Sequence, residues 1–387
     1  MTMSRGGRWT RAAAIALPLV LATSLSTRPA TAAAGSGQAA AKASSLPSRL
    51  SDAEFWKLVS DISEPGGYFR ISDNYTSNER EVGQLFTMLR DGGVQGGVYI
   101  GVGPEQNFSY IAAIRPAMAF VVDIRRQAVM QHLMFKAAFE LARDRADFIA
   151  LLFSKPRPAD LDGTTPIQRI WEAYQMVATD PAAAARNSTR IVEHLTRTHR
   201  FTFTPDESAQ LESVLEAFVQ FGPAISTRGA SGGGGGGNGV TFADLTGWSL
   251  NGEGQPQSFL STEEHFRVVK SLHEKNLIVP VSGDFAGPRA IRAIGAYLRK
   301  QGGIVSAFYL SNVEQYLFQD GKQRAFYDNV ATLPVNGGSV FIRPYSLRRG
   351  GGAAQSLCPI AGFIGAVGAG RISSNSDALA CVRLAAQ

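Results

Sequence analysis

The sequence predicts an α/β fold in which a mostly parallel sheet carries helices on both faces and a large all-helical insertion follows the second strand. Three observations support this prediction. Residues 96–126 have the pattern of a strand, a glycine turn, a helix and a second strand, the unit from which parallel sheets are built. The alternation returns over 262–346, whereas 129–225 has helical periodicity and few strand signals.

Composition and charge favour a globular protein without a nucleic-acid partner. Of the 387 residues, 44% are hydrophobic and 18% are charged, which is enough apolar material for a sizeable core. The net charge is +6, but Arg5, Arg8, Arg11 and Arg28 supply four of these charges before the first acidic residue, Asp52. The remaining +2 gives no electrostatic reason to expect nucleic acid.

The first 34 residues have the pattern of a signal peptide. Three early arginines precede the apolar run AAAIALPLVLA, which is followed by small residues. The run is too short to cross a bilayer, so we expect export to the periplasm or the extracellular space, with no membrane span after cleavage. A retained tether and a later start site are the alternatives.

The predicted elements follow in chain order. Residues 35–50 are small and polar, typical of a flexible linker. A helix over 51–62 has Ser51 as N-cap and Glu54 in the capping-box position, and a second helix runs from Ser77 to the glycines at 92 and 93. The sheet domain covers 51–128 and 262–346. Its remaining predicted elements are strands at 97–103, 117–124, 277–284, 303–311 and 339–345, and helices at 104–114, 262–276, 288–302 and from 312.

The insertion at 129–225 is predicted to be entirely helical. One long helical segment covers 126–153, and further helices are expected at 166–178, 181–200 and 205–221. Residues 226–261 contain six consecutive glycines and are expected to form a mobile loop.

The tail at 347–387 holds both cysteines, Cys358 and Cys381. In an oxidising compartment they could form a disulfide that pins the tail, and two free thiols are the alternative. No metal site is predicted. His194 and His199 are five residues apart, which places them on different sides of an α-helix.

The glycine loop after the first strand departs from a phosphate-binding loop. Gly101 and Gly103 match the first two glycines, but Pro104 removes an amide donor and Glu105 places a carboxylate at the helix N-terminus. A pyrophosphate is therefore disfavoured. A ligand with a cationic group would be compatible, as would simple capping by Glu105.

Other candidates follow the predicted strands. Asp123 lies 22 residues after Gly101, the separation at which an acidic residue can accept ribose hydroxyls, although it could instead pair with Arg125 or Arg126. Asp284 and Asn312 follow later strands, where helix capping is the alternative. The candidate binding residues are Gly101, Gly103, Glu105, Gln106, Asn107, Asp123, Arg125, Asp284, Phe285, Ser311, Asn312 and Glu314, with Asn74 and Asn78 as a candidate crevice lid.

The chain resembles the class I S-adenosylmethionine-dependent methyltransferase fold over roughly 75–345. The resemblance rests on VYIGVG, on Asp123 and Asp284 at strand ends, on Ser311 and Asn312 after the fourth strand, and on LPVNGGSVFI. It implies a Rossmann-like sheet and S-adenosylmethionine as cofactor. The chain also looks similar to a bacterial exported family of unknown function with the blocks GVGPEQNFSYIAA, VDIRRQ and YLSNVEQYL, which implies no activity.

Three functions agree with these features. The first is an exported protein that binds a small polar or nucleoside-like ligand at the strand ends, with no identifiable set of catalytic residues. The second is an active methyltransferase with an unknown acceptor. The third is a non-catalytic envelope protein whose helical insertion presents the surface for a protein partner.

Overall fold

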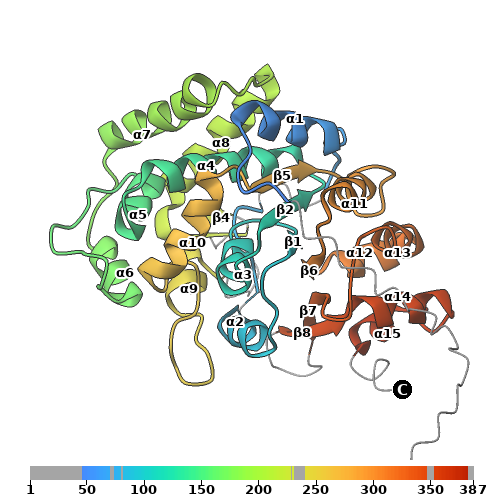
Figure 1. Ribbon diagram of the computed structural model, residues 1–387. Coiled ribbons are helices and arrows are strands. Elements are labelled where there is room, and N and C mark those ends of the chain that lie inside the picture. The colour runs from blue at the N-terminus through green and yellow to red at the C-terminus, as the bar shows by residue number, and fades with distance from the viewer. Residues whose placement is uncertain are drawn as a thin grey trace, which may run out of the picture. The chain divides into compact units, whose positions relative to one another are not determined.

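A six-stranded sheet organises the described part of the chain (Figure 1). Its spatial order is β5-β2-β1-β6-β7-β8. The strands are β1 (Val98–Gly101), β2 (Met118–Asp123), β5 (Ile278–Ser282), β6 (Val305–Tyr309), β7 (Val340–Ser346) and β8 (Ala353–Pro359). The computed structural model describes residues 46–69, 74–79, 82–227, 229–230, 240–346 and 353–381, all within the unit Ala43–Gln387.

The first five of these strands in chain order run parallel, which confirms the predicted mostly parallel α/β sheet. Val98 pairs with Met118 of β2, Ala119 pairs with Ile278 of β5, and β6 pairs with β1 and β7 in the same direction. Numbered along the chain, these strands lie in the order 3-2-1-4-5. The winding direction therefore reverses between β1 and β6, and in such sheets a crevice opens outside the strand ends at that point.

Helices flank both faces of the sheet in Figure 1, with α2, α3 and α10 on one side and α11, α13 and α14 on the other. The helices are α1 (Asp52–Ile62), α2 (Val82–Asp91), α3 (Gln106–Ile114), α4 (Arg126–Leu141), α5 (Arg145–Phe153), α6 (Ile167–Gln175), α7 (Pro181–Glu193), α8 (Pro205–Phe221), α9 (Phe242–Gly247), α10 (Glu263–Glu274), α11 (Ala290–Gln301), α12 (Val313–Gln319), α13 (Gln323–Val330), α14 (Ile360–Gly368) and α15 (Asn375–Leu379).

The N-terminus of α1 has the predicted capping box. The Ser51 side chain accepts a hydrogen bond from the Glu54 N–H, and the Glu54 carboxylate accepts from the Ser51 N–H at 2.8 Å. Leu50, at the end of the predicted linker, is buried, and its N–H donates to the Lys275 carbonyl at 3.0 Å. The packed part of the chain therefore begins before α1.

The prediction of one helical segment over 126–153 is wrong in one detail, because the chain turns between α4 and α5. Ala142 is extended, and the Asp144 side chain accepts a hydrogen bond from the Asp147 N–H as the N-cap of α5. An aspartate within an apolar helical pattern can end one helix and begin the next. Its side chain accepts a hydrogen bond from a backbone N–H in the first turn of the new helix, which has no carbonyl partner there.

The expectation that His194 and His199 lie on different sides of a helix is also wrong. Residues His194–Thr198 form a π-helical turn after α7, and the His199 N–H donates to the His194 carbonyl at 3.0 Å. A π turn holds one more residue than an α turn, so side chains five apart lie on one face. The two imidazole centroids are 4.8 Å apart.

The mobile-loop prediction for 226–261 is wrong over its second half. Residues 240–261 contain α9 and bury several apolar side chains, among them Phe242, Phe259 and Leu260. Gly247 lets this segment approach Trp171, because a Cβ at Gly247 would lie 2.6 Å from the indole ring. The short strands β3 (Ile225–Ser226) and β4 (Gly229–Ala230) pair with each other, and residues 231–239, which include the six consecutive glycines, lie outside the described residues.

The C-terminal region is part of the sheet rather than a tail. Strand β8 pairs antiparallel with β7, with Phe341 opposite Cys358. Cys358 and Cys381 form the predicted disulfide, with their Cα atoms 5.9 Å apart. The disulfide links β8 covalently to the end of α15. It stabilises the fold because it lowers the conformational entropy of the unfolded chain.

Residues 1–45 lie outside the described chain, and with them the predicted signal peptide and most of the predicted linker. Among the residues that the structure describes, none of the helices is long and apolar enough to cross a membrane.

Candidate functional site

A cavity of about 340 Å³ opens at the carboxyl ends of the central strands. Four strand ends contribute to its lining, with Gly103 after β1, Asp123 at the end of β2, Asp284 after β5 and Ser311 after β6. This is the place where the strand order reverses. The volume lies in the range of about 300–1,000 Å³ that is usual for small-molecule sites.

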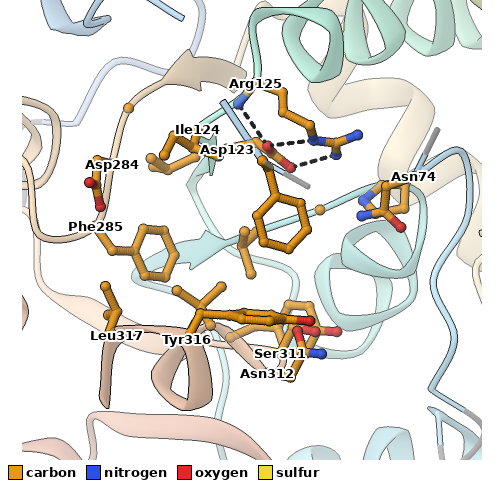
Figure 2. Close-up of a pocket in the computed structure, with 18 of the residues that line it drawn as sticks. Asn74, Asp123, Ile124, Arg125, Asp284, Phe285, Ser311, Asn312, Tyr316 and Leu317 are labelled. Atoms are coloured by element: carbon orange, nitrogen blue, oxygen red, sulfur yellow. Dashed lines mark hydrogen bonds and ion pairs between the residues drawn. The ribbon is translucent and has the colours of Figure 1, made fainter. Parts of the chain in front are cut away.

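Aromatic side chains form much of the cavity wall. Phe285 and Tyr316 both point toward the centre in Figure 2. Tyr68 and Phe69 come from the segment after α1, and the Phe69 ring meets the Tyr316 ring edge to face, with centroids 5.1 Å apart. These flat apolar surfaces suit a planar ring system.

Asp123 and Arg125 form the principal charged pair in the cavity, drawn with dashed lines in Figure 2. Asp123 Oδ1 accepts from the Arg125 N–H at 2.9 Å and from Nε at 3.1 Å, while Oδ2 accepts from Nη2 at 2.9 Å. Both residues are buried. The structure therefore shows the predicted pairing with Arg125, and Asp123 lines the cavity at the same time.

The glycine loop is held in place by Asn107, which does not line the cavity. Asn107 Nδ2 donates to the carbonyl oxygens of residues 102, 103 and 104 at 3.0, 3.0 and 2.7 Å, and its Oδ1 accepts from Tyr99 at 2.8 Å. Gly101 also lies outside the lining and leaves room for this amide, because a Cβ there would overlap Asn107 Oδ1. Gly103 lines the cavity with φ +77°, the left-handed region that glycine tolerates.

Glu105 does not play the electrostatic role expected from the sequence. Its carboxylate is buried, lies outside the cavity lining, and accepts from the Ser77 N–H at 3.3 Å. Burial raises the pKa of Glu105 to about 8, so the carboxyl is largely protonated at neutral pH. A largely protonated Glu105 carries little charge with which to repel phosphate or attract a cation, and it makes no side-chain cap to α3.

A second buried glutamate, Glu79, was not singled out by the sequence pattern. Glu79 Oε1 accepts from Ser311 Oγ at 2.7 Å, and Oε2 accepts from Gln106 Nε2 at 3.4 Å. Burial raises the pKa of Glu79, and its hydrogen bonds lower it in part. Gln106 also donates to the Tyr110 hydroxyl. Two predicted site residues, Gln106 and Ser311, thus join the cavity to a polar network beneath it.

The turn after β5 is shaped by Glu64 rather than by Asp284. The Glu64 carboxylate accepts from the N–H groups of Asp284, Arg289 and Ala290, at 3.2, 2.8 and 2.9 Å, and so caps α11. Asp284 accepts from the Ala286 N–H at 2.9 Å and lies 3.6 Å from the Lys322 ammonium. No local signal identified Glu64, because the contact spans about 220 residues.

The remaining predicted residues divide between the cavity and the core. Asn74, Asn78 and Asn312 line the cavity, and the Asn312 side chain makes no cap bond to α12. Glu314 does not line it. The Glu314 carboxylate is buried against Arg343, with Oε2 2.6 Å from Nε and Oε1 2.8 Å from Nη2, and it also accepts from Tyr327 at 2.7 Å.

The fold and the cavity define an α/β protein with a small-molecule-sized crevice at its strand ends. The chain belongs to a family described as a domain of unknown function (DUF7790), whose pattern matches residues 75–180 and 248–356, more than half of the chain. No curated protein matches it. This membership agrees with the resemblance to a family of unknown function found in the sequence.

Proposed function

We propose that this protein binds a small nucleoside-like ligand in the cavity at the strand ends. The observation that carries the proposal is the composition of the wall, which combines aromatic faces with the hydrogen-bonding side chains of Asp123, Asp284 and Ser311 at three of the four strand ends. We also infer that the sheet is Rossmann-like, of the methyltransferase type, which the order 3-2-1-4-5 supports. In that arrangement Asp123 and Gly103 would lie beside the sugar, and Phe285 and Tyr316 beside the base.

The lone pairs of Asp123 define the kind of ligand further. A carboxylate offers about four acceptor sites, and Arg125 fills three of them in this structure. About one acceptor site remains, on Asp123 Oδ2. Asp123 can therefore accept a hydrogen bond from one ribose hydroxyl, but not from both. The residues therefore fit S-adenosylmethionine only in part, since a dual ribose contact would require Arg125 to move.

The exposed hydrophobic side chains of the helical insertion give little support to the alternative in which the insertion binds a protein partner. Among the described residues of 129–225, Met176 is the exposed large hydrophobic side chain, at 87% exposure. One side chain does not make the contiguous apolar patch that protein interfaces usually need. Export remains a proposal, supported by the disulfide and by the signal-peptide pattern.

The test is a thermal-shift screen with adenosine, other nucleosides, S-adenosylhomocysteine and S-adenosylmethionine. A ligand at 100 times its Kd adds about 2.7 kcal/mol to the free energy of unfolding, which raises the midpoint measurably. We expect stabilisation by at least one nucleoside-containing compound. If none of them raises the midpoint, the proposal fails.

The variant Asn312→Ala locates the bound ligand. The Asn312 side chain lines the cavity without capping α12, so its removal should weaken binding about 5-fold while leaving the unliganded midpoint unchanged. Met176→Ala is the matched control, because Met176 is exposed and lies outside the cavity lining. Equal affinities of Asn312→Ala and Met176→Ala would place the ligand elsewhere.

A further inference from the structure

A cluster of three metal-ligating side chains lies on the helical segment, away from the strand-end cavity. Glu140 Oε2 is 2.8 Å from His194 Nε2 and 2.7 Å from His199 Nε2. The candidate ligand atoms of the three residues all lie within 4.8 Å of one another. None of them lines the cavity.

The π turn creates this cluster. In an α-helix, residues five apart point about 140° away from each other, so two such histidines could not share a ligand. The turn His194–Thr198 adds a residue and brings His194 and His199 to the same side, facing Glu140 near the end of α4.

The second nitrogen of His199 has the partner that metal-bound histidines usually have. His199 Nδ1 lies 2.7 Å from Asp52 Oδ1, and Asn276 Nδ2 donates to the same oxygen at 2.9 Å. A carboxylate on one ring nitrogen orients the ring and makes the other nitrogen a better ligand. This contact directs His199 Nε2 toward Glu140.

Lys136 positions the glutamate. Its ammonium donates to Glu140 Oε1 at 2.6 Å and also to the His273 carbonyl at 2.7 Å, so Oε2 is the oxygen left for the histidines. The Asp52 and Glu140 carboxylates carry two negative charges and Lys136 one positive charge, while Lys270, which donates to the Glu140 carbonyl, is paired with Glu274. With neutral imidazoles these side chains have a net charge of −1, which favours a cation.

We propose that Glu140 Oε2, His194 Nε2 and His199 Nε2 bind one divalent transition metal of the Zn²⁺ class. Two imidazoles and one carboxylate form a ligand set that zinc accepts, with a fourth position for water. The His194 and His199 side chains are 18% and 11% exposed, so solvent reaches that position. The ion would join α4 to the π turn and, through Asp52, to α1.

The experiment is titration of the full, metal-stripped chain with Zn²⁺ by calorimetry. We expect one equivalent with a Kd below about 10 µM, and a raised unfolding midpoint. His194→Ala and His199→Ala should each weaken binding at least about 10-fold, and Asp52→Asn about 10-fold. His265→Ala is the control, because His265 contacts Ser261 outside the cluster, and its Zn²⁺ affinity should match that of the parent.

A second measurement uses the parent protein alone, so that it does not depend on the folding of the variants. Co²⁺ replaces Zn²⁺ and absorbs visible light strongly when its coordination number falls to four or five. We expect this absorption after one equivalent of Co²⁺. Its absence, or Zn²⁺ binding that His194→Ala leaves unchanged, would overturn the proposal and leave an imidazolium bridging Glu140 and Asp52.

Discussion

Two glutamates, the fully buried Glu105 beside the glycine loop and the partly buried Glu140 on α4, show opposite electrostatic behaviour. Glu105 accepts from the Ser77 N–H, and burial raises its pKa to about 8. Glu140 is partly buried, and its bonds to His194, His199 and Lys136 outweigh that burial and lower its pKa well below the usual value. Glu140 keeps its charge because the Lys136 ammonium and two imidazoles contact it, whereas Glu105 is fully buried and its carboxylate accepts from the Ser77 N–H.

The two regions therefore use glutamate for different purposes. Beneath the strand-end cavity, a largely neutral carboxyl secures the segment before α2 to the loop after β1. On the helical segment, a charged carboxylate brings together the Lys136 ammonium and the imidazoles of His194 and His199. Two measurements test this difference between the glutamates, and a third tests the glycine loop beside Glu105.

The largest expected effect is that of Glu140→Gln. Removing the charge leaves the Lys136 ammonium buried without its anion, which should lower the free energy of unfolding by about 4 kcal/mol. Urea denaturation at pH 5 with a chelator present measures this loss. Glu105→Gln is the matched control and should stay within about 1 kcal/mol, since folded Glu105 is already neutral there. Similar losses in both variants would contradict the comparison.

The next effect is the pH dependence contributed by Glu105. Folded Glu105 keeps a proton that the unfolded chain releases above pH 4.5, so its contribution to stability is complete below that pH and is lost as pH rises to about 8. Relative to Glu105→Gln, the parent should lose about 3 kcal/mol between pH 5 and pH 8. Denaturation midpoints across this range measure the difference. Parallel curves for the two proteins would mean that Glu105 is charged in the folded state.

Smaller losses in the free energy of unfolding are expected when either of the two loop glycines, Gly101 or Gly103, is replaced by alanine. Gly101→Ala forces a methyl group against Asn107 and Tyr99 and should cost about 2 kcal/mol. Gly103→Ala meets no atom within 4 Å but must keep φ near +77°, which costs about 1 kcal/mol. Urea denaturation of both variants measures which substitution lowers the free energy of unfolding more. A larger cost at Gly103 would show that backbone strain outweighs packing in this loop.

Local patterns predicted the sheet elements well but the cavity only in part. The strands at 97–103 and 117–124, and the N-cap at Ser51, follow from apolar periodicity and capping chemistry, which act within a few residues. Asp123 and Ser311 were found because parallel strands end at one edge. Tyr68 and Tyr316 carried no comparable signal, since nothing near them in sequence shows which loops meet.

The mostly parallel sheet and the candidate strand ends could be predicted from the sequence, and the disulfide was one of two alternatives that it left open for Cys358 and Cys381. The burial of Glu105, the capping of α11 by Glu64 and the convergence of His194 and His199 on Glu140 at a π turn appear only in the folded structure. The difference follows from how far apart in the sequence the interacting residues lie. Periodicity and capping act between neighbours along the chain, whereas burial, charge state and side-chain convergence depend on contacts such as those between residues that lie 54 and 220 positions apart.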